Sequence, residues 1–507
     1  MRRERADYMI LSACAVIFLV MIFPLRGSMT DDTFIHMQYA RHLAEDGELS
    51  FNRGDPTYGA TSPLWVFLLA LVHKVGGDMA AWSRILSQFF GFASVLLVYR
   101  IVMRIDGRRF TAGAAALVMS CEAWLVRWST VGMETSFSVF MIAAVLMTSL
   151  SASRSTVRSL LFGALLFLSY LTRPETLLIA PIFIFAFLAA GEGAPLRNRS
   201  IWLVSFLLCL LVWFPSIKAH TGTYFPLTAG AKQGSIVFSA ELLRRATVPA
   251  RILGSSMALP LAAVIAALVF RAAGSREILG PAGRGMGAGV LAGLIWIFAL
   301  PAVFVVMDFQ VLSRYMILVS PAVIAIGMVA AVRIAGKVIR SDGARRTAVC
   351  LLVAVAMAQN VLLYSLVIVR PTREFSEGLS GVISEIGMYL ARNADPGAVV
   401  AAPDIGAVGY YSGLRVLDLG GLVTPEINRM RRDMDVEKII DEGLYLDLGA
   451  DYLMDRSTEG MRFSGRVIRG SRFEPLMSGV VKNLGIRNQV PVTYALYRIE
   501  PVEGEGP

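Results

Sequence analysis

Mainly apolar runs, most of them close to the length of a membrane-spanning helix, recur through the first 370 residues of this 507-residue chain. A helix needs roughly 20 mainly apolar residues to cross a bilayer. Eleven segments qualify or come close: residues 8–25, 83–104, 110–130, 132–150, 158–172, 174–190, 200–219, 251–271, 286–307, 313–333 and 346–369. Only 17% of residues are charged, against about a quarter in soluble proteins. We therefore expect a polytopic α-helical membrane protein, not a soluble enzyme, a disordered chain or a coiled coil.

Arginine and lysine positions predict the orientation. With a cytoplasmic N-terminus, every predicted inner loop is basic, as the positive-inside rule requires: Arg104/Arg108/Arg109, Arg154/Arg158, Arg197/Arg199, Arg271/Arg276/Arg284 and Arg333/Lys337/Arg340/Arg345/Arg346. No small-residue cleavage site follows the first run, which indicates an uncleaved anchor. We expect a multi-pass protein of the plasma (inner) membrane with an extracytoplasmic C-terminus. Basic loops explain the net charge of +10, so membrane lipids and not nucleic acid are the expected partners.

A shorter apolar run interrupts the first outer loop, residues 26–82. Residues 63–76 are too few to cross upright, and a crossing there would place the basic residues 104–109 outside. We therefore expect a helix that lies in the outer interface or dips into it. The first outer loop is then long and partly embedded in the membrane.

The composition changes near residue 371. From there to the end the chain has 15 Lys and Arg against 20 Asp and Glu, and no run long enough to span. The alternation of short strands and helices predicts a small extracytoplasmic α/β domain. Expected strands are residues 398–404, 415–421, 451–455 and 493–500, and expected helices are 376–392 and 434–447. We expect two domains, 1–370 and 371–507, and we call the second the tail.

One glycine pair in the tail raises a choice between a binding loop and a turn. Gly406 and Gly409 follow a predicted strand, as glycines of phosphate-binding loops do. The spacing does not fit GxGxxG, and no amphipathic helix is evident after it. A plain turn is therefore the favoured interpretation.

An acidic pair, Asp31 and Asp32, follows the outer end of the first apolar run. Charges beside hydrocarbon are costly, which makes them candidates for function. The alternative is structural, because an aspartate here would cap a helix over residues 33–44.

Further charged residues fall on the same outer surface. Arg173, Lys232 and Arg314 lie outside the membrane in the predicted topology, against the usual bias. This position favours a specific anionic ligand, whereas snorkelling or lipid headgroup contact is the alternative. Glu134 and Glu175 also face outward, and they could equally be helix caps or ion-pair partners of Arg127 or Arg173. Outer acids with outer bases fit an activated hydroxyl and a phosphate leaving group.

These motifs together resemble the GT-C glycosyltransferases. Within that superfamily the chain most resembles the actinobacterial terminal β-(1→2)-arabinofuranosyltransferase group and its bacterial relatives. The matching elements, between residues 30 and about 427, are Asp31-Asp32, Tyr39-Ala40-Arg41, Thr61-Ser62-Pro63-Leu64-Trp65, Gly132-Met133-Glu134-Thr135, Arg173-Pro174-Glu175, Lys232, Arg314-Tyr315, the stretch from Asp404 to Gly413, and Asp418 with the residues after it.

The resemblance implies a membrane enzyme that transfers a sugar from a polyprenyl-phosphate carrier to a glycan or glycolipid acceptor of the cell envelope. It implies Asp31 as general base, with Asp32 as runner-up and Glu134 as a further acidic element. Arg173, Lys232 and Arg314 are expected at the donor phosphate. Substrate contacts are expected from His36, Arg41, Tyr58, Thr61, Tyr315 and Asp404. Arabinofuranose, another pentose or a hexose would fit, and no protein partner is implied.

The expected chemistry is a single displacement. A positioned base contributes about 10²–10⁴-fold to the attack of a sugar hydroxyl. One base opposite the leaving group gives inversion, whereas retention of the usual kind needs a second carboxylate as nucleophile. A divalent cation (Mg²⁺, Mn²⁺ or Ca²⁺) held by Asp31 and Asp32 could share the work, since hard cations prefer carboxylate oxygens.

Two other functions stay open at this stage. A transporter or flippase of lipid-linked sugars would need charges at mid-membrane and repeated, broken helices, and no internal repeat is evident. A non-catalytic membrane scaffold is compatible with the tail, but the clustering of charged motifs on one surface argues against it.

Overall fold

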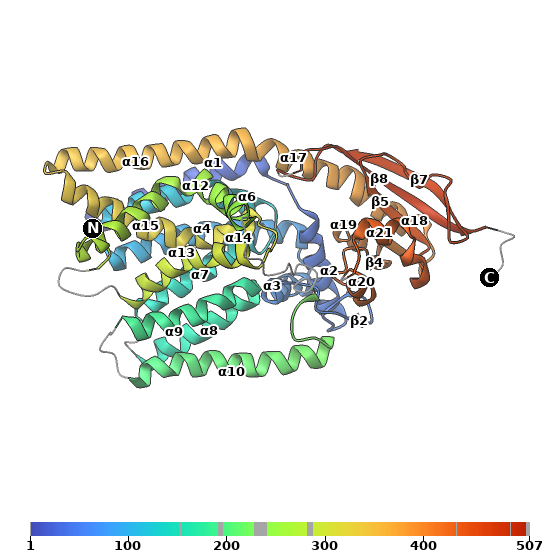
Figure 1. Cartoon of the computed structure of the whole chain (residues 1–507), viewed down its shortest axis with the longest axis horizontal. Helices are drawn as coiled ribbons and strands as arrows, with labels where there is room; N and C mark the ends of the chain where they lie inside the picture. The colour runs from blue at the N-terminus through green and yellow to red at the C-terminus, as the bar shows by residue number, and fades with distance from the viewer. Residues whose placement is uncertain are drawn as a thin grey trace.

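The computed structural model describes residues 2–151, 155–190, 196–227, 241–280, 287–431, 433–486 and 488–502. A bundle of helices fills one end of the molecule and a sheet-containing tail fills the other (Figure 1). The chain begins at the end of the bundle that faces away from the tail. Helices α2 (Asp31–Glu45) and α3 (Pro63–Lys74) lie between the two parts.

Each of the eleven predicted apolar segments is mainly helical in its described residues. Within the part of the chain that the structure describes, seven helices are long and apolar enough to cross a membrane: residues 5–25, 79–105, 200–221, 241–272, 288–306, 313–338 and 342–393. The other four segments form shorter helices, so the count of eleven spans stays a prediction. The bundle helices are α1 (Arg2–Ile22), α4 (Met79–Ile105), α5 (Arg109–Ser120), α6 (Ala123–Thr130), α7 (Thr135–Ser149), α8 (Thr156–Thr172), α9 (Ile179–Ala189), α10 (Leu196–Thr221), α12 (Glu241–Ala272), α13 (Ala288–Val306), α14 (Ser313–Met316), α15 (Ser320–Val338) and α16 (Asp342–Leu363).

Short turns of helix connect or extend several of these elements. Those of the bundle are η1 (Phe23–Leu25), η3 (Pro174–Leu178), η4 (Arg276–Ile278) and η5 (Ile317–Val319). Helix α3 occupies the short apolar run of the first outer loop, so the predicted helix there is present. Its position in the membrane interface stays a prediction.

One helix of 52 residues, 342–393, runs from the bundle into the tail. It consists of α16, α17 (Val369–Gly378) and α18 (Ser384–Asn393), joined by two π-helical turns, η6 (Tyr364–Ile368) and η7 (Leu379–Ile383). The composition boundary near residue 371 therefore lies inside a continuous helix, and no loop separates bundle from tail at that point.

The tail is built on a six-stranded mixed sheet of order β4-β3-β5-β8-β7-β6. Strands β3, β4 and β5 are parallel, and β5, β8, β7 and β6 pair antiparallel. The strands are β3 (Val399–Ala402), β4 (Arg415–Asp418), β5 (Tyr452–Ser457), β6 (Val467–Ile468), β7 (Ser471–Val481) and β8 (Val492–Pro501). The other tail elements are α19 (Gly406–Ser412), α20 (Pro425–Met430), α21 (Val436–Asp441) and η8 (Leu444–Leu448). The predicted α/β tail and its four predicted strands are confirmed, while β6, β7, α19 and α20 were not predicted.

The two faces of this sheet have different partners. Alternate side chains of a strand point to opposite faces. Ala401 belongs to an apolar core with residues of α20, α21 and η8, whereas Val400 and Ala402 belong to a core shared with the first outer loop. Helix α2 packs against both α3 and α19. The first outer loop thus serves as part of the apolar core of the tail.

A buried asparagine extends the sheet edge across this boundary. The first loop forms a small hairpin of β1 (Ser50–Asn52) and β2 (Asp55–Pro56). The side-chain amide of Asn52 donates to the carbonyl of Val416 at 3.0 Å and accepts from its N–H at 2.9 Å. It therefore satisfies the open edge of β4 as a neighbouring strand would.

Candidate active site

Asp31 is the first residue of α2, and its carboxylate points to the tail. Oδ2 accepts from the N–H of Gly406 and Oδ1 from the N–H of Ala407, both at 2.8 Å. The alternative of an aspartate capping its own helix is therefore wrong, because Thr30 holds the N-cap position and α2 has no side-chain cap hydrogen bond. The local sequence around Asp31 could not reveal this contact, because Gly406 lies 375 positions away along the chain.

The glycine that meets Asp31 is required by this contact. A Cβ at residue 406 would lie 2.0 Å from the backbone oxygen of Asp31 and 2.9 Å from its Cγ. Gly409, one turn on, is similarly close to Phe51. The favoured interpretation of these glycines as a plain turn is wrong: they form the first turns of α19 and let it approach the first outer loop.

A second carboxylate, Asp404, lies on the tail side of the site. Its Oδ2 accepts from Arg456 Nη1 at 2.8 Å and from the Tyr494 hydroxyl at 2.7 Å. Arg456 and Tyr494 are directly opposite each other on β5 and β8. Burial, and then the nearby Asp404, raise the pKa of Asp31 above its ordinary value, although the two N–H bonds oppose this.

Asp32 points instead to the bundle, where it forms an ion pair with Arg314 of α14. Its side chain is 41% exposed, whereas Asp31 is 9% exposed. The two neighbouring carboxylates therefore have different environments: Asp31 is held by uncharged backbone groups, and Asp32 by a guanidinium.

A buried ion-pair group lies beside Asp32. Arg173, at the C-terminal end of α8, pairs with Glu134 and, at 3.1 Å, with Glu175. Of the structural alternatives that the sequence left open, the ion pairs of Arg173 with Glu134 and with Glu175 are both present. Glu134 Oε2 lies 3.7 Å from His36 Nδ1. Burial lowers the pKa of His36, which favours the neutral ring.

Tyr315 connects these groups. The Arg173 guanidinium lies 4.7 Å from the centre of the Tyr315 ring, and that of Arg314 lies 5.2 Å from it. Cations over aromatic faces are attracted by the ring quadrupole. We call the resulting set the paired-charge cluster: Asp32, His36, Glu134, Arg173, Glu175, Arg314 and Tyr315. Seven residues from well-separated segments thus meet next to Asp31.

The remaining predicted residues are spread around this centre. Arg41 donates to the Tyr410 carbonyl at 3.2 Å and lies 4.9 Å from its ring, on the tail side. Tyr58 is buried against Trp213, and Thr61 is partly buried just before α3. Tyr58 and Thr61 are not members of the paired-charge cluster. Lys232 lies outside the described residues.

The two carboxylates of the acidic pair face different parts of the molecule. Asp31 is bonded to backbone N–H groups of α19 and Asp32 to Arg314, so the carboxylates serve different partners. Within the described residues no group of three or more His, Cys, Asp or Glu is arranged to hold a metal ion. A shared divalent cation stays a proposal from the sequence, and no step below depends on it.

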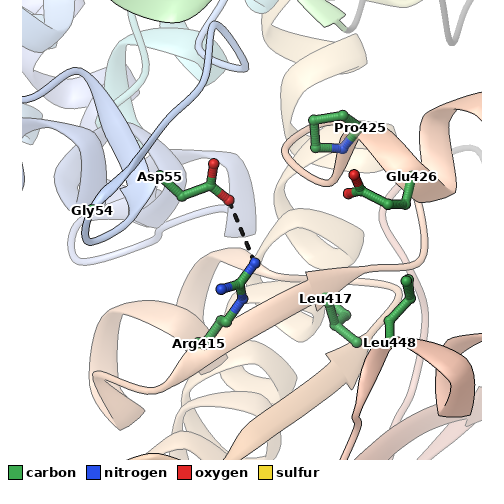
Figure 2. A pocket seen from close by; sticks show the side chains of 7 residues that line it. All are labelled: Gly54, Asp55, Arg415, Leu417, Pro425, Glu426 and Leu448. Atoms are coloured by element: carbon green, nitrogen blue, oxygen red, sulfur yellow. Dashed lines mark ion pairs between the residues drawn. The ribbon is translucent and has the colours of Figure 1, made fainter.

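Two cavities lie along the boundary between the first outer loop and the tail. One, of about 350 Å³, is lined by residues of the β1–β2 hairpin, β4 and α20, with Arg415 and Asp55 paired across it at 3.7 Å (Figure 2). The other, of about 430 Å³, includes Arg41, Arg53 and again Arg415. Both are lined by charged side chains from the two parts of the chain.

Three contributions to this site were not predicted: the N–H groups of Gly406 and Ala407, and the pair Arg456 and Tyr494 that holds Asp404. The strands carrying Arg456 and Tyr494 were predicted, but their pairing register was not. Predicting the antiparallel register in which residue 456 faces residue 494 would have placed Arg456 and Tyr494 side by side.

Two family models match parts of the chain. Residues 60–218 match dolichyl-phosphate-mannose-protein mannosyltransferase, and residues 372–497 match a domain of unknown function, DUF8728. Neither covers half of the chain. Among curated proteins, none is significantly similar in sequence.

Solved structures match nearly the whole chain. ArnT from Cupriavidus metallidurans, bound to undecaprenyl phosphate, has a TM-score of 0.60 at 14% identity, covering 96% of this chain and 97% of that one. The oligosaccharyltransferase AglB from Archaeoglobus fulgidus, with an inhibitory peptide and a dolichol-phosphate, has 0.58 at 13%, covering 89% and 69%. Arabinofuranosyltransferase AftD from Mycobacteria has 0.55 at 17%, covering 98% of this chain but 40% of AftD.

At these identities the structural likeness shows the fold, and the mannosyltransferase family match adds support from sequence. The long apolar helices are those of a multi-pass membrane protein. The chain is a membrane protein with the GT-C glycosyltransferase fold, and the family match over residues 60–218 supports glycosyltransferase activity.

Proposed function

We propose that this protein transfers a sugar from a polyprenyl-phosphate donor to a glycan or glycoconjugate of the cell envelope, on the outer side of the plasma membrane. The observation that carries the proposal is the convergence of Asp31, Asp404 and the paired-charge cluster where bundle, first outer loop and tail meet. Support also comes from similar proteins whose structures contain undecaprenyl phosphate or a dolichol-phosphate.

Asp31 is the proposed general base. It takes the proton of the acceptor hydroxyl, whose oxygen forms a bond to the anomeric carbon of the donor. The bond from that carbon to the phosphate oxygen breaks, and its electron pair leaves with the carrier phosphate. Attack opposite the leaving group gives inversion. The raised pKa makes Asp31 a stronger base than an ordinary aspartate, whereas the charge of Asp32 is already engaged by Arg314.

The two arginines of the paired-charge cluster are proposed to face the donor phosphate. Arg173 and Arg314 both carry carboxylate partners, so each stabilises a phosphate only to the extent that its pair rearranges. Lys232 is a further proposed phosphate contact. His36, Tyr315 and Asp404 are proposed around the sugar, and Arg41, Tyr58 and Thr61 farther out. The charged cavities between first loop and tail are suited to a polar acceptor.

Arabinofuranose is the proposed donor sugar, with another pentose or a hexose as the alternative. Its support is the motif resemblance and the likeness to AftD, an arabinofuranosyltransferase. The mannosyltransferase family match favours the hexose. The proposed topology has a cytoplasmic N-terminus and an extracytoplasmic tail.

The test is a transfer assay with purified full-length protein in nanodiscs. A panel of polyprenyl-phosphate sugars, including arabinofuranose and mannose, is offered with envelope glycans as acceptors, and a soluble nucleotide sugar serves as donor control. We expect transfer from one lipid-linked donor, none from the nucleotide sugar, and loss of transfer in Asp31→Asn. Transfer from the nucleotide sugar alone would contradict the donor class. Full activity in Asp31→Asn would contradict the assignment of the base.

A further inference from the structure

Arg127 is a buried arginine that the proposed mechanism does not use. It lies in α6 and is 7% exposed. Its guanidinium covers the ring of Trp128, 3.9 Å from the centre, and its Nε donates to the Thr372 hydroxyl at 3.3 Å. Its Nη1 has no hydrogen-bond partner among the described residues, and no carboxylate there pairs with it.

A second unsatisfied donor lies beside it. Tyr364 is 1% exposed, and its hydroxyl has no partner among the described residues. Tyr364 and Arg314 are both close enough to Arg127 to act on its charge. Tyr364 opens the π-helical turn η6, and single π-helical turns within longer helices are frequent at functional sites.

Arg127 differs from the two arginines of the paired-charge cluster in having no carboxylate partner among the described residues. Arg173 has two carboxylate partners and Arg314 has one. A buried cation without a counter-charge is strongly unfavourable, as is a buried donor without an acceptor. An acceptor with negative charge, placed between Arg127 and Tyr364, removes both costs at once, whereas a water molecule would satisfy the donors but leave the charge uncompensated.

We propose that Arg127 and Tyr364 form an oxyanion site that binds the phosphate of the lipid carrier. The lipid identity rests on the proposed function, while the anion site rests on the geometry alone. Two features favour a lipid phosphate over a free anion. The helix that carries Tyr364 exposes the apolar side chains of Leu362 and Leu366, where a polyprenyl chain could lie. Arg127 also adjoins Arg314 of the paired-charge cluster, so a phosphate bound there lies near the proposed transfer site.

The site should also bind the phosphate of the released carrier more strongly than the phosphate of the donor. A phosphate monoester carries about one charge more than a diester near neutral pH. A cation free of carboxylates therefore stabilises the leaving group as its charge develops, which is the differential binding that accelerates a reaction. The paired arginines can do this only by giving up a carboxylate.

The experiment measures binding without requiring turnover. Purified full-length protein in nanodiscs is titrated with farnesyl phosphate, inorganic phosphate and farnesol. The variants are Arg127→Met, Arg127→Lys and Tyr364→Phe. The matched control is Arg370→Met, six residues after Tyr364 on the same helix, where the side chain is 83% exposed and pairs with Glu374. Thermal melting of each variant without ligand checks that it folds.

We expect farnesyl phosphate to bind the wild type and Arg370→Met alike. Arg127→Met should weaken binding at least about tenfold, because a hydrogen bond to a charged group is lost. Tyr364→Phe should weaken it several-fold, and Arg127→Lys should recover part of the loss. Inorganic phosphate binding as tightly as farnesyl phosphate, with the same losses in the variants, would support the anion site and identify its ligand as a free anion.

Unchanged affinity in both Arg127→Met and Tyr364→Phe would overturn the site, as would farnesol binding as tightly as farnesyl phosphate. Tyr364→Phe keeps the proposal testable if Arg127→Met fails to fold. Phosphate binding that depends on Arg127 in a protein without transferase activity would support the site while contradicting the proposed function, so the two failures are distinguishable.

Discussion

The tail side and the bundle side of the candidate site hold adjacent aspartates in opposite ways. On the tail side, backbone N–H groups of α19 hold Asp31, and a second carboxylate, Asp404, lies close by. On the bundle side, a guanidinium holds Asp32. Burial and the nearby Asp404 raise the pKa of Asp31 although the N–H bonds oppose this, whereas the guanidinium neutralises the charge of Asp32.

This difference assigns different roles to the two sides. A base must accept a proton, which a carboxylate does more readily when it is buried near another negative charge. An ion pair has the opposite effect, but it fixes the geometry of the groups around it. The tail side is thus suited to proton transfer and the bundle side to positioning.

The most direct way to break this comparison is to remove the charge of each aspartate in turn. We expect Asp31→Asn to lower kcat by about 10²–10⁴-fold, the usual contribution of a general base, and Asp32→Asn to lower it much less. Transfer assays under identical conditions measure both. Similar losses in the two variants, or a larger loss in Asp32→Asn, would reverse the assignment.

The positioning role of the bundle side predicts a large effect on stability. Arg173→Met leaves the buried Glu134 without its cation, and loss of one partner of a buried ion pair costs about 3–5 kcal/mol. Glu134→Gln should cost less, because Arg173 keeps Glu175 and the amide can still accept a hydrogen bond. Thermal melting in nanodiscs measures this, with the exposed Arg370→Met as control. Equal melting of Arg173→Met and the control would show that the pair contributes nothing.

The docking of the tail can be tested without changing any carboxylate. In Gly406→Ala the added Cβ would lie 2.0 Å from the backbone oxygen of Asp31, so the two elements must separate. We expect a destabilisation of about 1–3 kcal/mol, typical of overpacking, together with a loss of transfer. Gly397→Ala is the matched control, since nothing lies within 4 Å of a Cβ there. Activity at wild-type level in Gly406→Ala would mean that Asp31 works without its contact to the tail.

These residues also show what local sequence could and could not predict. The apolar runs predicted the helices, and the alternation of strand and helix predicted the tail, because both depend on local patterns of burial. The charged residues Asp32, Glu134, Arg173 and Arg314 were predicted to share one surface, and the structure brings them into one cluster.

The partners of the charges were harder to predict. An ion pair of Arg173 with Glu134 or Glu175 was one of the stated alternatives, but Arg314 was expected at a ligand and its partner Asp32 lies 282 residues away. The contact between Asp31 and α19 joins positions 375 residues apart. Such pairings depend on the packing of distant segments, whereas a local window records only which residue types are present.

The smallest expected effect concerns the influence of Asp404 on Asp31. The proposed base works only when deprotonated, so the rate should fall as pH decreases through the raised pKa of Asp31. Asp404→Asn removes a negative charge that contributes to that increase, so the pKa falls and the acidic limb of kcat/KM should move to lower pH. Burial is the larger cause of the shift and is unchanged, so we expect a change at neutral pH of less than about tenfold. Tyr494→Phe is the control, because it removes a hydrogen bond from Asp404 but keeps the charge. A limb that stays in place or moves to higher pH would mean that the charge of Asp404 does not act on Asp31, and the raised pKa of Asp31 would then rest on burial.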